Sequence, residues 1–204
     1  MEAFYPIIKS IKTNQFYSKN YLLLSEMTEV GGECAVIYNI KNKIDNRKFI
    51  LKFMEYDITD HDSEKLIYNE INIHEKCFLL GIAPEIIEAW ICEKGAVIIM
   101  VKLLKTVNEI LTNSNLKLEL KHDILKDVIY IIKKMHENGI THGDTHNENF
   151  MVDISDDGKY RCYVIDFGAS TNDSKRFAYD YDIFSDLLPL HLQKEFDNFQ
   201  NIEN

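Results

Sequence analysis

Residues His136–Ser170 read HENGITHGDTHNENFMVDISDDGKYRCYVIDFGAS, and this stretch holds two short motifs that decide how the chain is interpreted. His142–Asp144 (HGD) is followed at Asn149 by an amide, which gives H-x-D-x-x-x-x-N. After an insert, Asp166–Gly168 gives D-F-G. Two such motifs in this order are typical of sites that transfer a phosphoryl group, and their ordered co-occurrence is rarer than either motif alone.

The residue types in these motifs match the needs of phosphoryl transfer. The reaction needs a carboxylate that orients and deprotonates the attacking hydroxyl, and it needs oxygen ligands that hold Mg²⁺ on the phosphates. We predict that Asp144 is this base and that Asn149 and Asp166 hold the metal, with Mn²⁺ as an alternative ion. The competing interpretation is that both aspartates are ordinary exposed acids on loops, because a D-F-G tripeptide often arises by chance.

Two apolar runs are expected to bring the motifs together. Phe150–Val152 and Tyr163–Ile165 are predicted to be short buried strands, and Ser155–Gly158 carries the Asp-Gly signal of a tight hairpin turn. The loop before the first strand and the loop after the second strand then become neighbours. The sequence therefore predicts that one metal ion can touch both Asn149 and Asp166.

Length and composition bound the remaining possibilities. The 204 residues suit one compact unit or two small lobes that share a cleft, and a hydrophobic content of 46% is enough to build a core. The formal charge of −10 argues against a nucleic-acid-binding surface as the main function, so no direct nucleic acid binding is predicted. No stretch approaches about 18 consecutive apolar residues, so no membrane span is predicted.

Cysteine usage indicates a reducing compartment. No C-x-x-C pair occurs, and no histidine lies at a spacing that suggests zinc. We therefore predict reduced and mostly packed thiols, and an intracellular, cytoplasmic protein. The four cysteines are Cys34, Cys77, Cys92 and Cys162.

The N-terminal half has the pattern of a sheet with a glycine turn. Between the first two predicted strands lie Gly31, Gly32 and Glu33, where residues without a Cβ let backbone amides approach a phosphate. We predict these three residues as cofactor contacts, although a paired glycine in a hairpin is often only a turn. The three predicted strands are Tyr21–Val30, Cys34–Ile40 and Lys48–Met54.

A lysine within the third strand predicts an ion pair. Lys52 interrupts apolar neighbours, although strand alternation could still direct it to solvent. Ser63–Leu80 is predicted to be a helix that carries Glu70 in its middle, with Glu75 as a competing partner. A pair of Lys52 and Glu70 would leave the ammonium group near the nucleotide phosphates, so both residues are predicted to be catalytic.

The next segment is predicted to contact an adenine ring. Glu85–Leu104 contains two strands around a Lys94–Gly95 turn, and the second strand continues into a connection. Main-chain groups near Lys102 could hydrogen-bond the ring, while Met100 and Ile37 pack on it, although for each apolar side chain a plain core position competes. Helix Leu116–Asn138 is then predicted to deliver the chain to the HGD motif on a rigid support.

In this order, the features resemble a protein kinase-like fold from the glycine turn near Gly31 to Asp166. The HGD motif, the short chain and the position of Glu70 before Gly81–Pro84 look most like the small atypical kinases. The nearest is the KEOPS-complex kinase family, with Rio kinases and minimal bacterial-effector or large-virus kinases more distant.

The resemblance implies an α+β, bilobal fold in a single minimal domain. It has a β-rich N-lobe at about residues 1–103 and a reduced helical C-lobe at about residues 104–204. It also implies an ATP- and Mg²⁺-dependent serine/threonine protein kinase, with a protein substrate or a regulatory protein partner. The compartment would be the host-cell cytoplasm for a viral or effector protein. By the same resemblance, Asp180 or Asp182 would brace the catalytic loop.

Departures from the pattern keep other functions open. The full G-x-G-x-x-G is missing, no A-P-E follows Gly168, and only 36 residues remain after it (204 − 168). H-G-D-x-H, completed by His146, also resembles aminoglycoside and choline kinases, which favours a small-molecule phosphotransferase. A third alternative is an ATPase or binding module within a protein complex.

Overall fold

The computed structural model describes residues 20–27, 35–55, 61–92, 95–154 and 159–203. The described residues up to Ile71 form one compact unit with Glu85–Lys102, here the first unit. Asn72–Pro84 and the residues from Leu103 onward form the second unit. Helix α2 (His61–Leu79) contributes turns to both. The predicted glycine turn at Gly31, Gly32 and Glu33, Cys34 and the hairpin turn Ser155–Gly158 lie outside the described residues.

The first unit is built on an antiparallel sheet with the strand order β1-β2-β3-β5-β4. This arrangement confirms the three predicted strands and the later strand pair. Strand β5 is apolar throughout and nearly all buried, as expected for a strand with neighbours on both edges. The strands are β1 (Tyr21–Met27), β2 (Ala35–Asn42), β3 (Lys48–Glu55), β4 (Ile86–Cys92) and β5 (Gly95–Val101).

The register of the sheet decides which way Lys52 points. Lys52 lies opposite Ile37 on β2 and opposite Ile98 on β5. Ile98 packs in a cluster with Met54 and with Ile67 of helix α2. Because residues directly opposite each other share a face of the sheet, Lys52 lies on the face that α2 covers and does not point to solvent.

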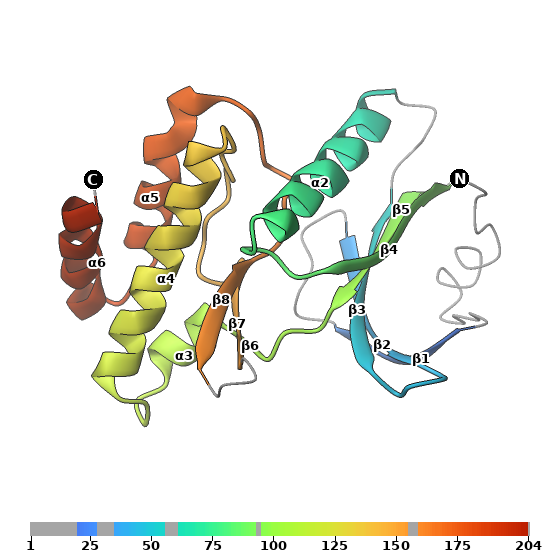
Figure 1. The fold of residues 1–204 in the computed structure, drawn as a ribbon, viewed down its shortest axis with the longest axis horizontal. Coiled ribbons are helices and arrows are strands. Elements are labelled where there is room, and N and C mark those ends of the chain that lie inside the picture. The colour runs from blue at the N-terminus through green and yellow to red at the C-terminus, as the bar shows by residue number, and fades with distance from the viewer. Residues whose placement is uncertain (1–19, 28–34, 56–60, 93–94, 155–158, 204) are drawn as a thin grey trace. The chain divides into compact units, whose positions relative to one another are not determined.

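The second unit combines a small sheet with helices. The sheet has the strand order β6-β7-β8, and helix α4 packs against β8, α5 and α6 (Figure 1). The predicted hairpin strands and the predicted long helix are confirmed, whereas β6, α3 and α6 were not predicted. The elements are β6 (Lys105–Thr106), α3 (Val107–Thr112), α4 (Leu118–Glu137), β7 (Phe150–Ile154), β8 (Tyr160–Val164), the 3₁₀ turn η1 (Ser174–Arg176), α5 (Phe177–Asp186) and α6 (Leu190–Glu203).

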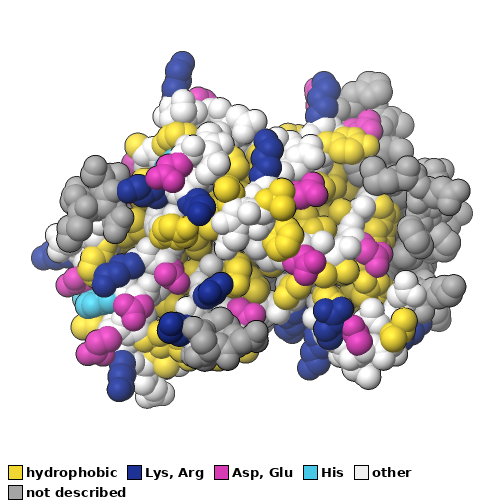
Figure 2. Space-filling view, viewed as in Figure 1, with side chains coloured by type: hydrophobic (Ala, Val, Ile, Leu, Met, Phe, Trp, Pro, Cys, Tyr) yellow, Lys and Arg dark blue, Asp and Glu magenta, His cyan; other side chains and the backbone are white. Residues whose placement is uncertain are grey.

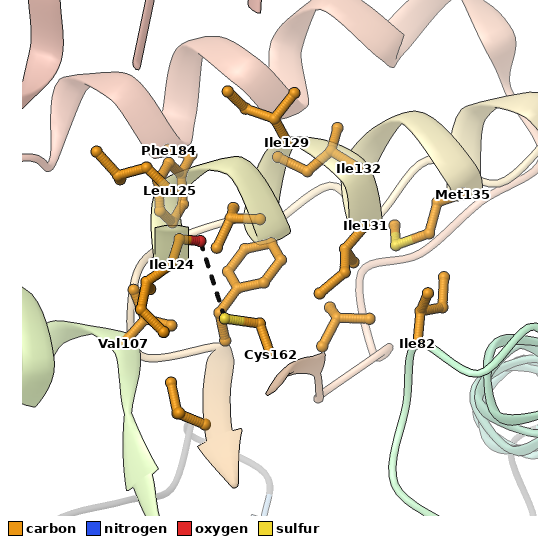
Figure 3. Packing of buried hydrophobic residues seen from close by; sticks show 14 of the residues in the cluster. Ile82, Val107, Ile124, Leu125, Ile129, Ile131, Ile132, Met135, Cys162 and Phe184 are labelled. Atoms are coloured by element: carbon orange, nitrogen blue, oxygen red, sulfur yellow. Dashed lines mark hydrogen bonds between the residues drawn. The ribbon is translucent and has the colours of Figure 1, made fainter. Parts of the chain in front are cut away.

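Helix α4 supplies one side of the main core of the second unit. Its apolar residues recur at helical spacing, and Figure 3 shows them packed over β8, where the Cys162 thiol donates to the Ile124 carbonyl oxygen at 3.8 Å. Burial raises the pKa of the Cys162 thiol well above its usual value and that of Cys77 to about 12. Both thiols are free and buried, which confirms the prediction of packed, reduced cysteines for these two positions.

One face of the described residues carries mixed charges (Figure 2). On the face shown in Figure 2, Lys and Arg side chains alternate with Asp and Glu side chains over both units. Interspersed charges of both signs are typical of a solvated surface. Within the described ranges, no helix combines the length and the apolar composition that a membrane crossing requires.

The aromatic centre of the second unit gives a first prediction. Phe184 on α5 is fully buried and contacts the rings of Phe150 and Phe196, with centroids 5.3 Å and 5.0 Å away. Phe184→Ala leaves a cavity, so we expect a loss of about 3–5 kcal/mol in the free energy of unfolding. Leu187→Ala is the control, because Leu187 is 52% exposed and should change stability by less than about 0.5 kcal/mol. Urea denaturation measures both, and equal losses would contradict this placement of α5.

Candidate active site

A buried ion pair joins strand β3 to helix α2. The Lys52 Nζ lies 2.7 Å from the Glu70 Oε1, and the two residues are only 6% and 3% exposed. Glu75, the competing partner, is exposed. The predicted pairing of Lys52 with Glu70 is therefore confirmed. Two opposite charges at this distance in a buried site hold each other firmly, because each charge unpaired would carry a large desolvation cost.

The residues predicted to contact adenine also belong to the first unit. Met100 is nearly buried in the cluster that contains Met54 and Ile98, so the structure places its side chain in the core. Lys102 is exposed, and its Nζ donates to the Asn39 Oδ1 at 2.5 Å. Its side chain is thus engaged with β2, and the role of its main-chain groups stays a prediction.

In the second unit, His142 ties the catalytic loop to the end of strand β8. Its buried ring donates from Nε2 to the Ile165 carbonyl oxygen at 3.0 Å and accepts at Nδ1 from the Asp144 backbone N–H at 3.3 Å. Burial lowers the pKa of His142, which favours the neutral ring that these two contacts require. His142 therefore serves as a fixed link beneath the loop that carries Asp144.

Asp180 on helix α5 braces the same loop from the other side. Its fully buried carboxylate accepts hydrogen bonds from the backbone N–H groups of His142 at 2.9 Å and Gly143 at 2.8 Å. The His136 Nε2 on α4 donates to it at 2.8 Å. Asp182 is exposed, so of the two aspartates that the resemblance suggested, Asp180 is the one that contacts the loop.

Asp144 is held with its carboxylate open to solvent. The Asp144 side chain is 51% exposed, and the Asn149 amide donates to its Oδ2 at 3.1 Å and to its main-chain oxygen at 2.9 Å. These contacts use the amide nitrogen of Asn149 and leave its Oδ1 without a hydrogen bond among the described residues. The Asp144 carboxylate is thus oriented for its predicted role as base, and Asn149 has an oxygen available for a cation.

The loop that carries Asp166 adjoins the loop that carries Asn149. The Ile165 N–H donates to the Asn149 carbonyl oxygen at 2.9 Å, which confirms that the two loops are neighbours. Asp166 has a φ of +63°, a conformation that is costly for a residue with a Cβ. The next residue, Phe167, is fully buried, with its ring 5.1 Å from that of His74 and 5.4 Å from that of His142.

The donor set of these loops suits a hard cation. Mg²⁺ prefers oxygen ligands and is commonly bound by one or two protein groups together with phosphates and water. Asp166 offers a carboxylate and Asn149 offers an amide oxygen, so both fit this role. In the described part of the chain, no three His, Cys, Asp or Glu side chains gather as a metal site, so the remaining ligands would come from the nucleotide and water.

Sequence reasoning missed a polar network between helix α3 and the catalytic loop. The Asn108 amide donates to the Glu148 Oε1 at 2.6 Å, and its Oδ1 accepts from the Asn147 amide at 3.1 Å. The Asn108 N–H also donates to the Asn147 carbonyl oxygen at 3.2 Å. A local signal was available, because Thr106-x-x-Glu109 is a capping box that starts α3 and places Asn108 in its first turn.

The family follows from this geometry and from sequence comparison. A family model described as the protein kinase domain matches residues 24–182. The chain belongs to the protein kinase family. The α+β protein kinase-like fold is thereby confirmed, while the finer likeness to KEOPS-complex kinases is not tested.

A curated relative supports the same family. The probable serine/threonine-protein kinase FPV226 of Fowlpox virus (strain NVSL) is 29% identical over 150 residues. The match covers 67% of this chain and 50% of the relative. The kinase chain therefore spans about half the length of the curated relative that it matches.

The buried ion pair gives a prediction for this kinase. Lys52→Met leaves the Glu70 carboxylate buried without its cation, so we expect a loss of about 3–5 kcal/mol in the free energy of unfolding. Adding Glu70→Met removes the second buried charge and should restore much of that stability. Thermal melting and turnover are compared for both variants. Recovery of turnover together with stability in the double variant would show that the pair has only a structural role.

The backbone at Gly143 gives another prediction. Gly143 has a φ of +82°, and a Cβ built there would lie 2.6 Å from the Ala169 carbonyl oxygen. Gly143→Ala should therefore cost more than the roughly 1–2 kcal/mol of left-handed backbone strain alone, and it should lower turnover. Gly139→Ala is a matched control, because Gly139 has a φ of +73° but nothing within 4 Å of the added Cβ. Equal losses in urea denaturation would contradict the close approach of Ala169.

Proposed function

We propose that this protein kinase transfers the γ-phosphoryl group of ATP to a serine or threonine hydroxyl of a protein acceptor. The observation that carries the proposal is the geometry of Asp144. Its carboxylate is half exposed and is oriented by a hydrogen bond from Asn149. The loop that carries it is also hydrogen-bonded, through its backbone, to the loop that holds Asp166. A reaction with a loose transition state needs mainly such positioning and charge stabilisation.

Each predicted residue has a distinct role in the proposed reaction. Asp144 orients the acceptor hydroxyl and takes up its proton as the new oxygen–phosphorus bond forms. Asn149 and Asp166 hold Mg²⁺, which neutralises charge on the phosphates when bound. Lys52 directs its ammonium group to nucleotide phosphates, and Glu70 fixes that ammonium in place.

One observation favours a small-molecule phosphotransferase as the second candidate. His146 approaches the predicted base, with its Nε2 3.5 Å from the Asp144 Oδ2, and H-G-D-x-H is the element shared with aminoglycoside and choline kinases. The likeness to KEOPS-complex kinases, a regulatory protein partner, a cytoplasmic location and an ATPase role within a complex also stay predictions. A small-molecule phosphotransferase would keep the proposed roles of Asp144, Asn149 and Asp166.

Radiolabelled ATP distinguishes these functions. The protein is incubated with [γ-³²P]ATP and Mg²⁺ alone, with mixed protein acceptors, and with small alcohols that include choline and an aminoglycoside. Label on serine or threonine of an acceptor protein supports the proposal. Label in a small molecule establishes the second candidate, and release of free phosphate alone indicates an ATPase.

The role of Asp144 as base gives a quantitative prediction. Asp144→Asn keeps the shape of the side chain but removes its basicity, so turnover should fall by about 100-fold or more. ATP binding, measured by isothermal titration, should hardly change. Asp182→Asn is the control, because Asp182 is an exposed aspartate outside the loop. Unchanged turnover in Asp144→Asn would remove Asp144 from the reaction.

The role of Asp166 gives a separate prediction about the metal. Asp166→Ala removes a carboxylate ligand, so ATP should bind more weakly in Mg²⁺ and should lose the difference between Mg²⁺ and EDTA. Asp144→Asn serves as the control, because it should keep that difference. A wild-type response of ATP affinity to Mg²⁺ in Asp166→Ala would show that another group holds the ion.

A further inference from the structure

His146 touches the predicted base, and the proposed reaction gives it no role so far. It lies two positions after Asp144, with its side chain one-third exposed and its Nε2 3.5 Å from the Asp144 Oδ2. Its Nδ1 accepts a hydrogen bond from the Glu148 backbone N–H at 3.3 Å. Because a ring nitrogen that accepts an N–H carries no proton, the proton of the neutral ring sits on Nε2 and faces Asp144.

The two oxygens of Asp144 therefore differ in their surroundings. The Oδ2 receives the Asn149 amide at 3.1 Å and faces the His146 Nε2–H. Among the described residues, no hydrogen bond reaches the Oδ1 of Asp144. The Asn149 hydrogen bond fixes the rotation of the carboxylate with the His146 ring near the same oxygen, and the other oxygen stays open to an acceptor hydroxyl.

Asn108 holds the part of the loop that fixes the ring of His146. Its three hydrogen bonds to Asn147 and Glu148 join the first turn of α3 to the loop. The Glu148 N–H, which sets the proton position on His146, belongs to this bonded segment. A chain of contacts thus runs from Asn108 through Glu148 and His146 to Asp144.

We propose that His146 is a positioning residue of the transfer step, which donates from Nε2 to the Asp144 Oδ2, and that Asn108 acts through it. The inference rests on the proposed function of Asp144 as base. The 3.5 Å separation is long for a hydrogen bond, but catalytic hydrogen bonds often shorten when the reactants bind. His146 thereby directs the Oδ1 of Asp144 toward the acceptor hydroxyl.

Two substitutions at His146 separate the effect of its hydrogen-bond donor from the effect of its side-chain volume. His146→Leu removes the donor, and turnover should fall about 10-fold, as expected for a lost hydrogen bond to a charged group. The KM for ATP should stay within about 2-fold of the wild-type value, because the substitution removes no contact that binds ATP in the ground state. His146→Gln keeps an N–H near the position of Nε2 and should retain at least about a third of wild-type turnover. Equal turnover in the two variants, or a KM for ATP that rises as much as turnover falls, would overturn the proposal.

A double-mutant cycle tests whether Asn108 acts through His146. Asn108→Ala should lower turnover about 3- to 10-fold, and the double variant Asn108→Ala/His146→Leu should be no slower than His146→Leu alone. If the fold-losses of turnover in the two single variants multiply in the double variant, the two residues act independently. Thr112→Val is the control in the same helix, because it removes only a hydroxyl bond to the Asn108 carbonyl oxygen.

A spectroscopic readout keeps the inference separate from the proposed function. The imidazole ¹⁵N spectrum of the whole protein should show His146 protonated on Nε2 and bare on Nδ1, and Asn108→Ala should mix the two tautomers. A proton on Nδ1 in the wild type overturns the inference whatever the activity. If no acceptor is ever phosphorylated, the proposed function fails and the kinetic role of His146 fails with it, while the tautomer still shows whether the ring faces Asp144.

Discussion

The buried carboxylate of Asp180 is the contact on which the catalytic loop depends. A fully buried anion is costly unless donors surround it, and Asp180 receives two backbone N–H groups of the loop and the ring of His136. The His136 ring also stacks on Phe177, with centroids 4.2 Å apart. Asp180 lies on α5, and its partners lie on α4 and on the loop between α4 and β7. The position of Asp144 therefore depends on correct packing of α4, which precedes it in the chain, and of α5, which follows it.

Two residues of the site have a left-handed backbone conformation, which is costly for Asp166 but not for a glycine. Gly143 at φ +82° is held by its N–H bond to Asp180, and Asp166 at φ +63° precedes a ring that is fixed in the core. That ring, Phe167, lies against His74 and His142. A strained residue persists only where its surroundings over-determine it, and Asp166 is followed by the buried ring of Phe167. The strain at Asp166 therefore belongs to the geometry that presents this predicted metal ligand.

Sequence reasoning succeeded where the determinants were local. The hairpin and the motifs at its two ends could be predicted, because alternation and turn chemistry act over a few residues. The prediction of Glu70 over Glu75 is confirmed by the structure, since side chains five positions apart on a helix point about 140° apart and only one can face β3. The contacts of Asn108 and of Asp180 with the loop join segments far apart in the chain, and such hydrogen bonds leave no periodic pattern, so only the family resemblance pointed to Asp180 or Asp182. Short elements such as β6 and α3 are also too brief for a pattern to develop.

The segment after the D-F-G motif belongs to the same scaffold. Asp180 follows Gly168 by only 12 positions, and several of the residues between them contact the catalytic loop. Thr171 exchanges two backbone hydrogen bonds with Thr141, both 2.9 Å long, and the buried Ser170 hydroxyl donates to the His142 carbonyl oxygen. A short link costs little entropy to close, so these few bonds are enough to order it. The residues between Gly168 and Asp180 are held against the catalytic loop, so they cannot also form a long surface that binds a protein acceptor. Acceptor recognition in the proposed reaction must therefore rely on other surfaces around the open carboxylate of Asp144.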